Sequence, residues 1–343
     1  MEALLGTSLG RYMNESMDLI LYDLYGTALS AFCQKSNLRV AGVSADLSLF
    51  ENSEAMKDFG LSIKEFYGGI AQDIFYSSRE IAELDSKAYD LIIAEAKTSS
   101  EETALLEKLD KHFSHETPLT CPILLMRKFR VGVKIALDKI SILQTCLNFR
   151  KLGLIAHALL ATYDGCILEC GSFRGGGTVF MGKLLDEWGD DRKIYTFDTF
   201  AGMPHPTNAD GTTIYQSGVF ADTSLEGVSS YVQEQGLAQK TTLIKGLVQD
   251  TLPDVLLREE HVSFALLDTD QYEGTLASLR LIVPKLQENG IILVDDYTVE
   301  GVKKAVSKIR EQYPQVGGAE VSMNFYMLWN RTNRYFLSSC QVC

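Results

Sequence analysis

The sequence carries little positive charge for its length. Lysine and arginine number 32 against 45 aspartate and glutamate residues, so the 343-residue chain has a formal net charge of −13. Proteins that bind a nucleic-acid backbone usually present a basic face, and anionic membrane surfaces attract polybasic segments. The charge balance therefore argues against nucleic acid and against a membrane surface as partners.

Long apolar runs are also missing. Residues 153–168 are interrupted by His157 and Asp164, and the first ten residues lack a basic segment followed by an apolar core. Seven cysteines, an odd number, are scattered through a chain of 46% hydrophobic composition, and the pair Cys340 and Cys343 has no second pair to complete a zinc site. Such cysteine usage is typical of reduced proteins, so we expect a cytoplasmic protein.

A dinucleotide fingerprint is absent from the N-terminal part. Apolar segments predict strands at residues 18–25, 38–45, 90–96 and 122–126, with helices at 27–36 and 101–111. This alternation predicts a parallel sheet, but the first turn holds Gly26 alone where a dinucleotide site has three glycines. We expect residues 1–128 to form a smaller α/β domain, a degenerate Rossmann-like unit used for packing, dimerisation or holding a substrate.

The remainder of the chain predicts a second α/β domain. Residues 129–160 carry apolar residues at helical spacing and predict helices that link the domains, either as a connector or as cover for a second site. Within residues 161–343, strands are predicted at 193–197, 241–245, 262–267, 290–294 and 325–330, and helices at 178–185, 275–286 and 301–312. The long polar segment 203–223 fits an active-site lid, with disorder as the other interpretation.

A glycine loop at residues 166–177 joins a predicted strand to a predicted helix. It reads CILECGSFRGGG, without the G-x-G-x-x-G spacing of dinucleotide sites. Glycines let the backbone approach a ligand, and the helix start adds free N–H groups. Because Glu169 precedes the first glycine, the loop suits a ligand with an amino group and a ribose better than a pyrophosphate. A tight turn without a ligand is the alternative.

Four of the predicted strands end in acidic residues, namely Glu169, Asp198, Asp268 and the pair Asp295–Asp296. In a parallel sheet these ends share one edge, outside which ligands bind. Asp198 follows the strand after the glycine loop and suits two ribose hydroxyls, with a helix cap as the alternative.

A cation is the second ligand that this edge predicts. The carboxylates of Asp268, Asp295 and Asp296 would repel one another unless protonated or bridged by a metal. Oxygen ligands without paired His or Cys favour Mg²⁺, Mn²⁺ or Ca²⁺ over zinc. A structural turn would explain Asp295–Asp296 but not the further acidic pair Asp268 and Asp270.

Taken together, these motifs resemble the macrocin O-methyltransferase family over about residues 167–314. Five blocks carry the resemblance, namely ECGSFRGGG (169–177), FDTFAGMP (197–204), KGLVQDTLP (245–253), LLDTDQYEGT (266–275) and GIILVDDY (290–297). Members of that family use S-adenosylmethionine and a metal to methylate hydroxyls of natural products. They usually show GDLYEST where this chain has TDQYEGT, a difference that keeps the carboxylates and alters residues expected near the substrate.

The resemblance implies a class I methyltransferase fold for residues 161–343 and a role for each matched residue. The implied cofactor residues are Glu169, Gly171, Ser172, Arg174, Gly175, Asp198, Thr199, Phe200, Gly246, Leu247 and Asp268. The first five cradle the methionine part, Asp198 holds the ribose, and Gly246 and Leu247 wall the adenine.

The same resemblance implies that Asp268, Asp295 and Asp296 bind Mg²⁺ or Mn²⁺. Asp268 is our choice of general base and His205, in the loop, is the second. We expect a small hydroxylated acceptor and a homo-oligomeric enzyme. The alternatives are a metal-independent class I methyltransferase, a catalytically dead scaffold that binds S-adenosylmethionine, and a sugar-nucleotide oxidoreductase, against which the absent dinucleotide fingerprint argues.

Overall fold

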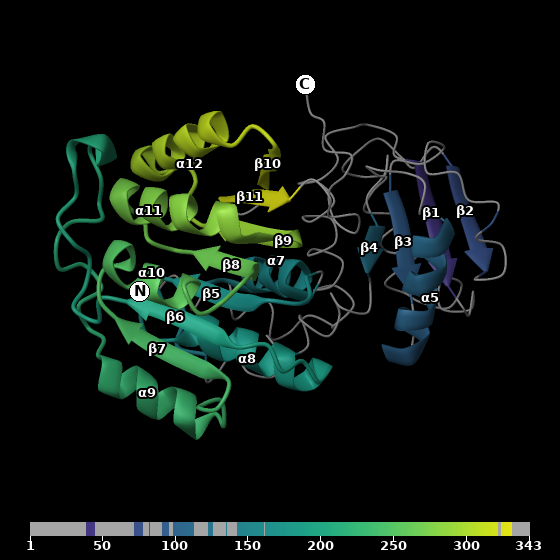
Figure 1. Cartoon of the computed structure of the whole chain (residues 1–343), viewed down its shortest axis with the longest axis horizontal. Coiled ribbons are helices and arrows are strands. Elements are labelled where there is room, and N and C mark those ends of the chain that lie inside the picture. Colours follow the sequence, from purple (N-terminus) through teal and green to yellow (C-terminus); the bar gives the residue numbers. More distant parts are fainter. Residues whose placement is uncertain are drawn as a thin grey trace, which may run out of the picture. The chain divides into compact units, whose positions relative to one another are not determined.

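The computed structural model describes residues 39–44, 72–77, 82, 91–95, 99–112, 123–125, 135, 143–160, 162–321 and 324–330 (Figure 1). The chain divides into two compact units, Met1–Arg130 and Val131–Cys343. Among the described residues, none of the helices combines the length and apolar character that a membrane span requires.

The first unit contains a parallel four-stranded sheet in the order β2-β1-β3-β4. Its elements are β1 (Arg39–Ser44), β2 (Gln72–Ser77), β3 (Leu91–Glu95), α5 (Ser99–His112) and β4 (Ile123–Leu125). The buried residues Leu105 and Leu109 lie one helical turn apart on α5. The strands predicted at 38–45, 90–96 and 122–126 and the helix at 101–111 are confirmed. The strand predicted at 18–25 and the helix at 27–36 lie outside the described residues.

The second unit is built around a seven-stranded sheet in the order β10-β11-β9-β8-β5-β6-β7. Its strands are β5 (Cys166–Cys170), β6 (Ile194–Asp198), β7 (Thr241–Lys245), β8 (Val262–Leu267), β9 (Leu286–Val294), β10 (Val316–Val321) and β11 (Phe325–Asn330). β11 runs antiparallel to both of its neighbours, while the pairs from β9 to β7 are parallel. The predicted class I Rossmann-like fold is therefore confirmed.

Six helices of this unit are described, namely α7 (Phe149–Leu160), α8 (Gly176–Trp188), α9 (Leu225–Glu234), α10 (Val248–Leu256), α11 (Tyr272–Ile282) and α12 (Glu300–Gln312). The helices α10, α11 and α12 cover one face of the sheet, where their apolar residues form a common core with alternate residues of the strands (Figure 1). α7 packs against α8, β8 and β9. The predicted linking segment therefore contributes α7 to the second unit itself.

Element boundaries differ from the predictions mainly around α11. The helix predicted at 275–286 runs from Tyr272 to Ile282, and the short 3₁₀ turn η4 (Val283–Lys285) follows. Pro284 lies in η4. Since proline has no N–H for the helix and its ring clashes with the preceding turn, it ends α11 there. β9 then begins at Leu286, four residues before the predicted start at Gly290.

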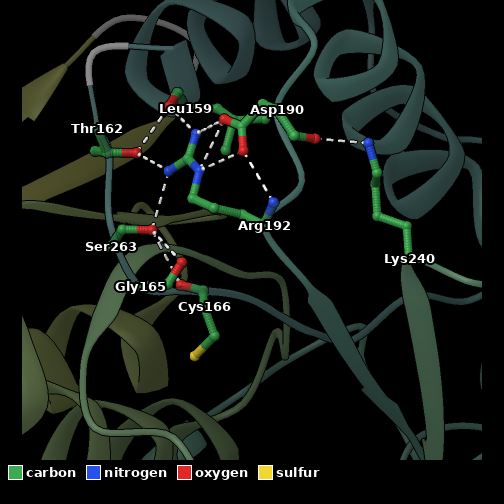
Figure 2. A network of polar contacts seen from close by, with 8 residues as sticks. All are labelled: Leu159, Thr162, Gly165, Cys166, Asp190, Arg192, Lys240 and Ser263. Atoms are coloured by element: carbon green, nitrogen blue, oxygen red, sulfur yellow. Dashed lines mark hydrogen bonds and ion pairs between the residues drawn. The ribbon is translucent and has the colours of Figure 1, made fainter.

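The edge of the sheet opposite the strands' carboxyl ends is held by Arg192, whose side chain is only 9% exposed (Figure 2). Its Nε donates to the Asp190 carboxylate at 2.8 Å, and its Nη1 donates to Thr162 Oγ1 at 2.9 Å and to Ser263 Oγ at 3.0 Å. Its Nη2 reaches the Leu159 carbonyl at 3.3 Å. One guanidinium thus joins the end of α7 to the starts of β6 and β8.

Candidate functional site

A cavity of about 560 Å³ lies at the carboxyl ends of the strands of the second unit. The chain proceeds from β5 to β6 on one side, whereas β8 pairs with β5 on the other side. Such a reversal of strand order leaves a crevice in which ligands of open α/β sheets bind. The cavity therefore occupies the position that the strand-end carboxylates predicted.

The structure brings most of the predicted site residues to this cavity. Those that line it are Glu169, Gly171, Ser172, Asp198, Thr199, His205, Gly246, Leu247, Asp268, Asp295 and Asp296. Arg174, Gly175 and Phe200 do not line it. Arg174 pairs with Asp222 instead, Gly175 caps α8 with a φ of 79°, and the Phe200 side chain is 5% exposed.

The glycine loop depends on glycine at the position where the chain leaves β5. Gly171 has a φ of +89°, and a Cβ there would lie 2.0 Å from the Asp268 carbonyl oxygen. Only glycine permits that approach, so the loop passes directly over the end of β8. The next residue, Ser172, is 7% exposed and lines the cavity. Its hydroxyl has no hydrogen-bond partner among the described residues, which leaves it available to a ligand.

Glu169, the residue before the last of β5, carries a buried carboxyl group. The residue is 2% exposed and accepts a short hydrogen bond from Thr178 Oγ1, with Thr196 Oγ1 at 3.5 Å from the same oxygen. Burial raises the pKa of Glu169 to about 8, although the hydrogen bond from Thr178 opposes the rise. At neutral pH the side chain is therefore mainly neutral, and its proton can be donated.

Asp198, at the end of β6, holds the backbone of two loops. Its Oδ2 accepts the N–H groups of Ser172 at 2.9 Å and Phe173 at 2.8 Å, and its Oδ1 accepts that of Phe200 at 2.7 Å. A carboxylate offers about four lone-pair sites, so about one is left for a ligand. The predicted grip on two ribose hydroxyls would require one N–H to leave.

Four carboxyl groups, which we call the carboxylate cluster, lie together where β8 and β9 end. They belong to Asp268, Asp270, Asp295 and Asp296. These strands are neighbours with Leu267 opposite Val294, so Asp268 and Asp295 follow side by side. Asp270 is 8% exposed and Asp295 3% exposed, and Asp270 and Asp296 have φ values of 56° and 52°. The left-handed residue Asp296 turns the chain after β9, which lets neighbouring side chains remain at one site.

Burial and mutual repulsion raise the pKa values of three of these groups. Burial raises the pKa of Asp268 well above its usual value, and the charge of Asp295 adds to the rise. The pKa of Asp270 is raised in the same way by burial and by Asp268. Asp295 has a pKa of about 6, because burial raises it and the ammonium of Lys151 opposes the rise. A further cation would favour the ionised forms of all three groups.

Lys151 is a member of the site that the sequence analysis missed. It projects from α7, and its Nζ lies 2.5 Å from Asp295 Oδ1, 2.7 Å from Asp295 Oδ2 and 3.7 Å from Asp296 Oδ1. Burial lowers the pKa of Lys151, but the charge of Asp295, the hydrogen bond to it and the charges of Asp268 and Asp296 together outweigh burial and raise the pKa. A lysine next to the apolar run LGLIAHALL was the available signal.

The segment 203–223 is held across the cavity by polar contacts. Tyr215 donates its hydroxyl hydrogen to Asp296 Oδ2, and Gln271 Nε2 donates to the carbonyls of Pro204 at 3.0 Å and Tyr215 at 2.9 Å. Asp210, 1% exposed, accepts the N–H of Tyr272 at 2.6 Å. In this structure the segment 203–223 forms a strap over the cavity.

The far end of the strap rests on the glycine loop. The rings of Phe173 and Phe220 have centroids 5.2 Å apart, and Thr223 Oγ1 donates to the Phe173 carbonyl at 2.5 Å. The Arg174–Asp222 ion pair lies beside them. The strap thus contacts both the glycine loop and the carboxylate cluster, whereas the second base candidate, His205, lies on its exposed part.

The chemical type of the donor atoms at this site suits a divalent cation. Carboxylate oxygens are the ligands that Mg²⁺ takes, and the four carboxylates face one ammonium among the described residues that line the cavity, that of Lys151. As the side chains lie, however, no three Asp, Glu, His or Cys side chains within the described residues form a group that could hold a metal. The donor chemistry therefore suits a metal, while Lys151 holds the Asp295 carboxylate.

Comparison with known proteins gives a family match and several similar enzymes. Residues 143–316 match the model of the macrocin-O-methyltransferase (TylF) family. Over 157 residues the chain is 31% identical to the 8-demethyl-8-(2,3-dimethoxy-alpha-L-rhamnosyl)-tetracenomycin-C 4'-O-methyltransferase of Streptomyces olivaceus, a match that covers 43% of this chain and 59% of that protein. Over 158 residues it is 27% identical to the demethyldecarbamoylnovobiocin O-methyltransferase of Streptomyces niveus, with the same two coverages. The chain thus spans 59% of the length of each of these relatives.

Solved structures with similar folds include two O-methyltransferases. The O-methyltransferase NovP matches with a TM-score of 0.45 and 22% identity, over 60% of this chain and 78% of that one. The calicheamicin methyltransferase CalS11 matches with a TM-score of 0.43 and 18% identity, over 74% of this chain and 90% of that one.

Proposed function

The chain belongs to the macrocin-O-methyltransferase family, and we propose that its second unit transfers a methyl group from S-adenosylmethionine to a hydroxyl of a sugar or another natural product. One observation supports this most strongly. A single cavity is lined by the glycine loop, by the ends of β6 and β7 and by the carboxylate cluster. A methyl donor and a polar acceptor can therefore meet in it.

The glycine loop is proposed to hold the methionine part of the cofactor. Gly171 lets the backbone approach the ligand, and the hydroxyl of Ser172 can donate to the methionine carboxylate. The start of α8 favours the same negative charge. The neutral Glu169 carboxyl beneath the loop does not oppose that carboxylate.

The adenosine is proposed to lie along the ends of β6 and β7. Thr199, Gly246 and Leu247 line that part of the cavity. Asp198 keeps the loops in place and has capacity for about one ribose hydroxyl. The roles that the resemblance implied for Arg174, Gly175 and Phe200 become indirect, since these residues shape the loops around the cavity.

Methyl transfer requires the acceptor oxygen to lie opposite the sulfur, in line with the methyl group. When the enzyme holds both reactants in this in-line geometry, a bimolecular step becomes effectively unimolecular. The acceptor oxygen forms the new C–O bond as the C–S bond breaks, and its proton passes to a base. Asp268 is our candidate, because it lines the cavity beside the loop and its raised pKa makes the carboxylate more basic. His205 is the second candidate.

A metal is proposed as the second cofactor. Asp268, Asp295 and Asp296 would hold Mg²⁺ or Mn²⁺, and such an ion lowers the pKa of a bound hydroxyl and fixes its position. Metal-independent transfer is the rival mechanism, and one observation favours it: Lys151 already neutralises Asp295.

The acceptor is proposed to be a small hydroxylated molecule, in particular a deoxysugar attached to a natural product. One relative is a 4'-O-methyltransferase of a tetracenomycin that carries a rhamnosyl group. We propose residues 161–343 as the catalytic domain, preceded by the linking segment 129–160, and a homo-oligomeric enzyme. The described cysteines Cys146, Cys166 and Cys170 are free thiols, in line with the proposed cytoplasmic location.

Methyl transfer to a panel of glycosylated natural products tests this function. Activity should disappear after EDTA treatment and return with Mg²⁺. Asp295→Asn should reduce turnover far more than it reduces S-adenosylhomocysteine affinity, whereas Asp254→Asn, at an exposed position of α10, should change neither. Turnover that survives both EDTA and Asp295→Asn would favour the metal-independent enzyme. Cofactor binding without turnover of any acceptor would favour the dead scaffold.

A further inference from the structure

We propose that Lys151 is a resident cation of the carboxylate cluster, which competes with a divalent metal ion for Asp295 and thereby sets the metal affinity of the site. The inference rests on the proposed metal-binding role of Asp268, Asp295 and Asp296. It concerns a residue that lies outside the five sequence blocks carrying the family resemblance.

The ammonium occupies both oxygens of one proposed metal ligand. Lys151 Nζ is 2.5 Å and 2.7 Å from the two oxygens of Asp295, whose side chain is 3% exposed. A carboxylate that donates an oxygen to a metal while keeping both of these contacts would bring two cations together. The ammonium in its present position therefore opposes metal binding at Asp295.

The surroundings of Lys151 favour its present position. Its Nζ lies 3.7 Å from Asp296 Oδ1 and 5.4 Å from the centre of the Phe325 ring, and its side chain is 16% exposed. A carboxylate on one side and an aromatic face on another both attract a cation. The ammonium thus has several partners to lose when a metal displaces it.

The packing of α7 explains why the Lys151 side chain reaches Asp295. The residue lies in the first turn of α7, 144 positions before Asp295, and α7 packs against both β8 and β9. Its position is therefore set by the same packing that sets the strand ends. A long flexible stem lets the ammonium retreat without moving the helix.

Titration of the metal-free protein with MnCl₂, followed by calorimetry, tests the proposal without any turnover. Lys151→Met removes the charge, Lys151→Arg keeps it, and Lys193→Met removes the same charge at the opposite edge of the sheet. Lys151→Met should bind Mn²⁺ at least about tenfold more tightly than wild type, because the competing charge is gone. The other two variants should stay within about threefold of wild type.

A second readout separates this role from a purely structural one. Without metal, Lys151→Met should have a lower melting temperature than wild type, because the buried Asp295 loses its partner; saturating Mn²⁺ should remove most of that difference. If Lys151→Met does not fold, Lys151→Gln takes its place, since an amide donates to Asp295 without a charge.

The outcomes also distinguish this inference from the proposed metal function. Equal or weaker Mn²⁺ binding by Lys151→Met, with binding by wild type, would overturn the inference and leave the metal function intact. Binding by Lys151→Met alone would support the inference and favour a native enzyme that works with its own ammonium. Absence of binding in every variant would overturn both.

Discussion

Replacing Glu169 by glutamine should flatten the pH dependence of stability of the second unit. The wild-type carboxyl is 2% exposed, and burial raises its pKa from 4.5 to about 8. Between these values the folded state retains a proton that the unfolded state has released. The stabilisation is therefore fully present below about pH 4.5 and is lost as the pH rises through about 8.

The size of the stability loss follows from the pH range between the two pKa values of Glu169, 4.5 and about 8. Each pH unit inside it removes about 1.4 kcal/mol of unfolding free energy. From about pH 5.5 to about pH 7, wild type should therefore lose about 2 kcal/mol more than Glu169→Gln. The amide keeps the shape of the side chain and an acceptor for Thr178. Because other buried carboxylates titrate in the same range, only the difference between the two proteins measures Glu169.

Urea unfolding followed by tryptophan fluorescence suits this measurement. Both tryptophans of the chain, Trp188 and Trp329, lie in the second unit, so the signal is not mixed with that of the first. Glu260→Gln makes the same chemical change on a side chain that is 88% exposed and should follow wild type. If Glu169→Gln loses stability with pH as steeply as wild type does, Glu169 is not the buried, protonated group described above.

Two further predictions concern the scaffold and the strap. Arg192→Ala should lower the unfolding free energy by about 3–5 kcal/mol, because Asp190 loses its ion-pair partner and the hydroxyls of Thr162 and Ser263 lose a charged donor. Arg258→Ala, at an exposed position, should cost little, and a loss below about 1 kcal/mol for Arg192→Ala would refute the role of the guanidinium. Asp210→Ala should accelerate limited proteolysis within residues 203–223, since its buried carboxylate ties the strap to α11, and cofactor plus acceptor should protect the wild-type strap. Cleavage that is equal with and without ligands would reject a lid.

The strands of the second unit could be predicted because most are short apolar runs with polar ends. The elements that were missed give weaker signals. β10 contains two adjacent glycines, α9 buries only Val228, Tyr231 and Val232, and α10 carries Pro253 within the helix. In the first unit, β2 reads QDIFYS, with only three consecutive apolar residues.

The candidate site likewise has features that the sequence could predict and features that it could not. The carboxylate cluster could be predicted because the ends of parallel strands share one edge, which requires no knowledge of side-chain packing. Lys151 and Tyr215 reach that cluster from 144 and 81 positions away, and no local pattern reports such contacts. The position of Asp198 was predicted, but its partners are backbone N–H groups of folded loops, which a sequence pattern does not specify.

Calorimetric titration with S-adenosylhomocysteine tests the central claim, that the cavity at the strand ends is a cofactor site, most directly. Wild type should bind one molecule per chain. Asp198→Ala should weaken binding at least about tenfold, because the Ser172 and Phe173 N–H groups lose a charged acceptor and the loop loses its shape. Asp254→Ala, at an exposed position, should bind as wild type does. Absence of binding by the folded wild-type protein, or unchanged affinity in folded Asp198→Ala, would contradict this account.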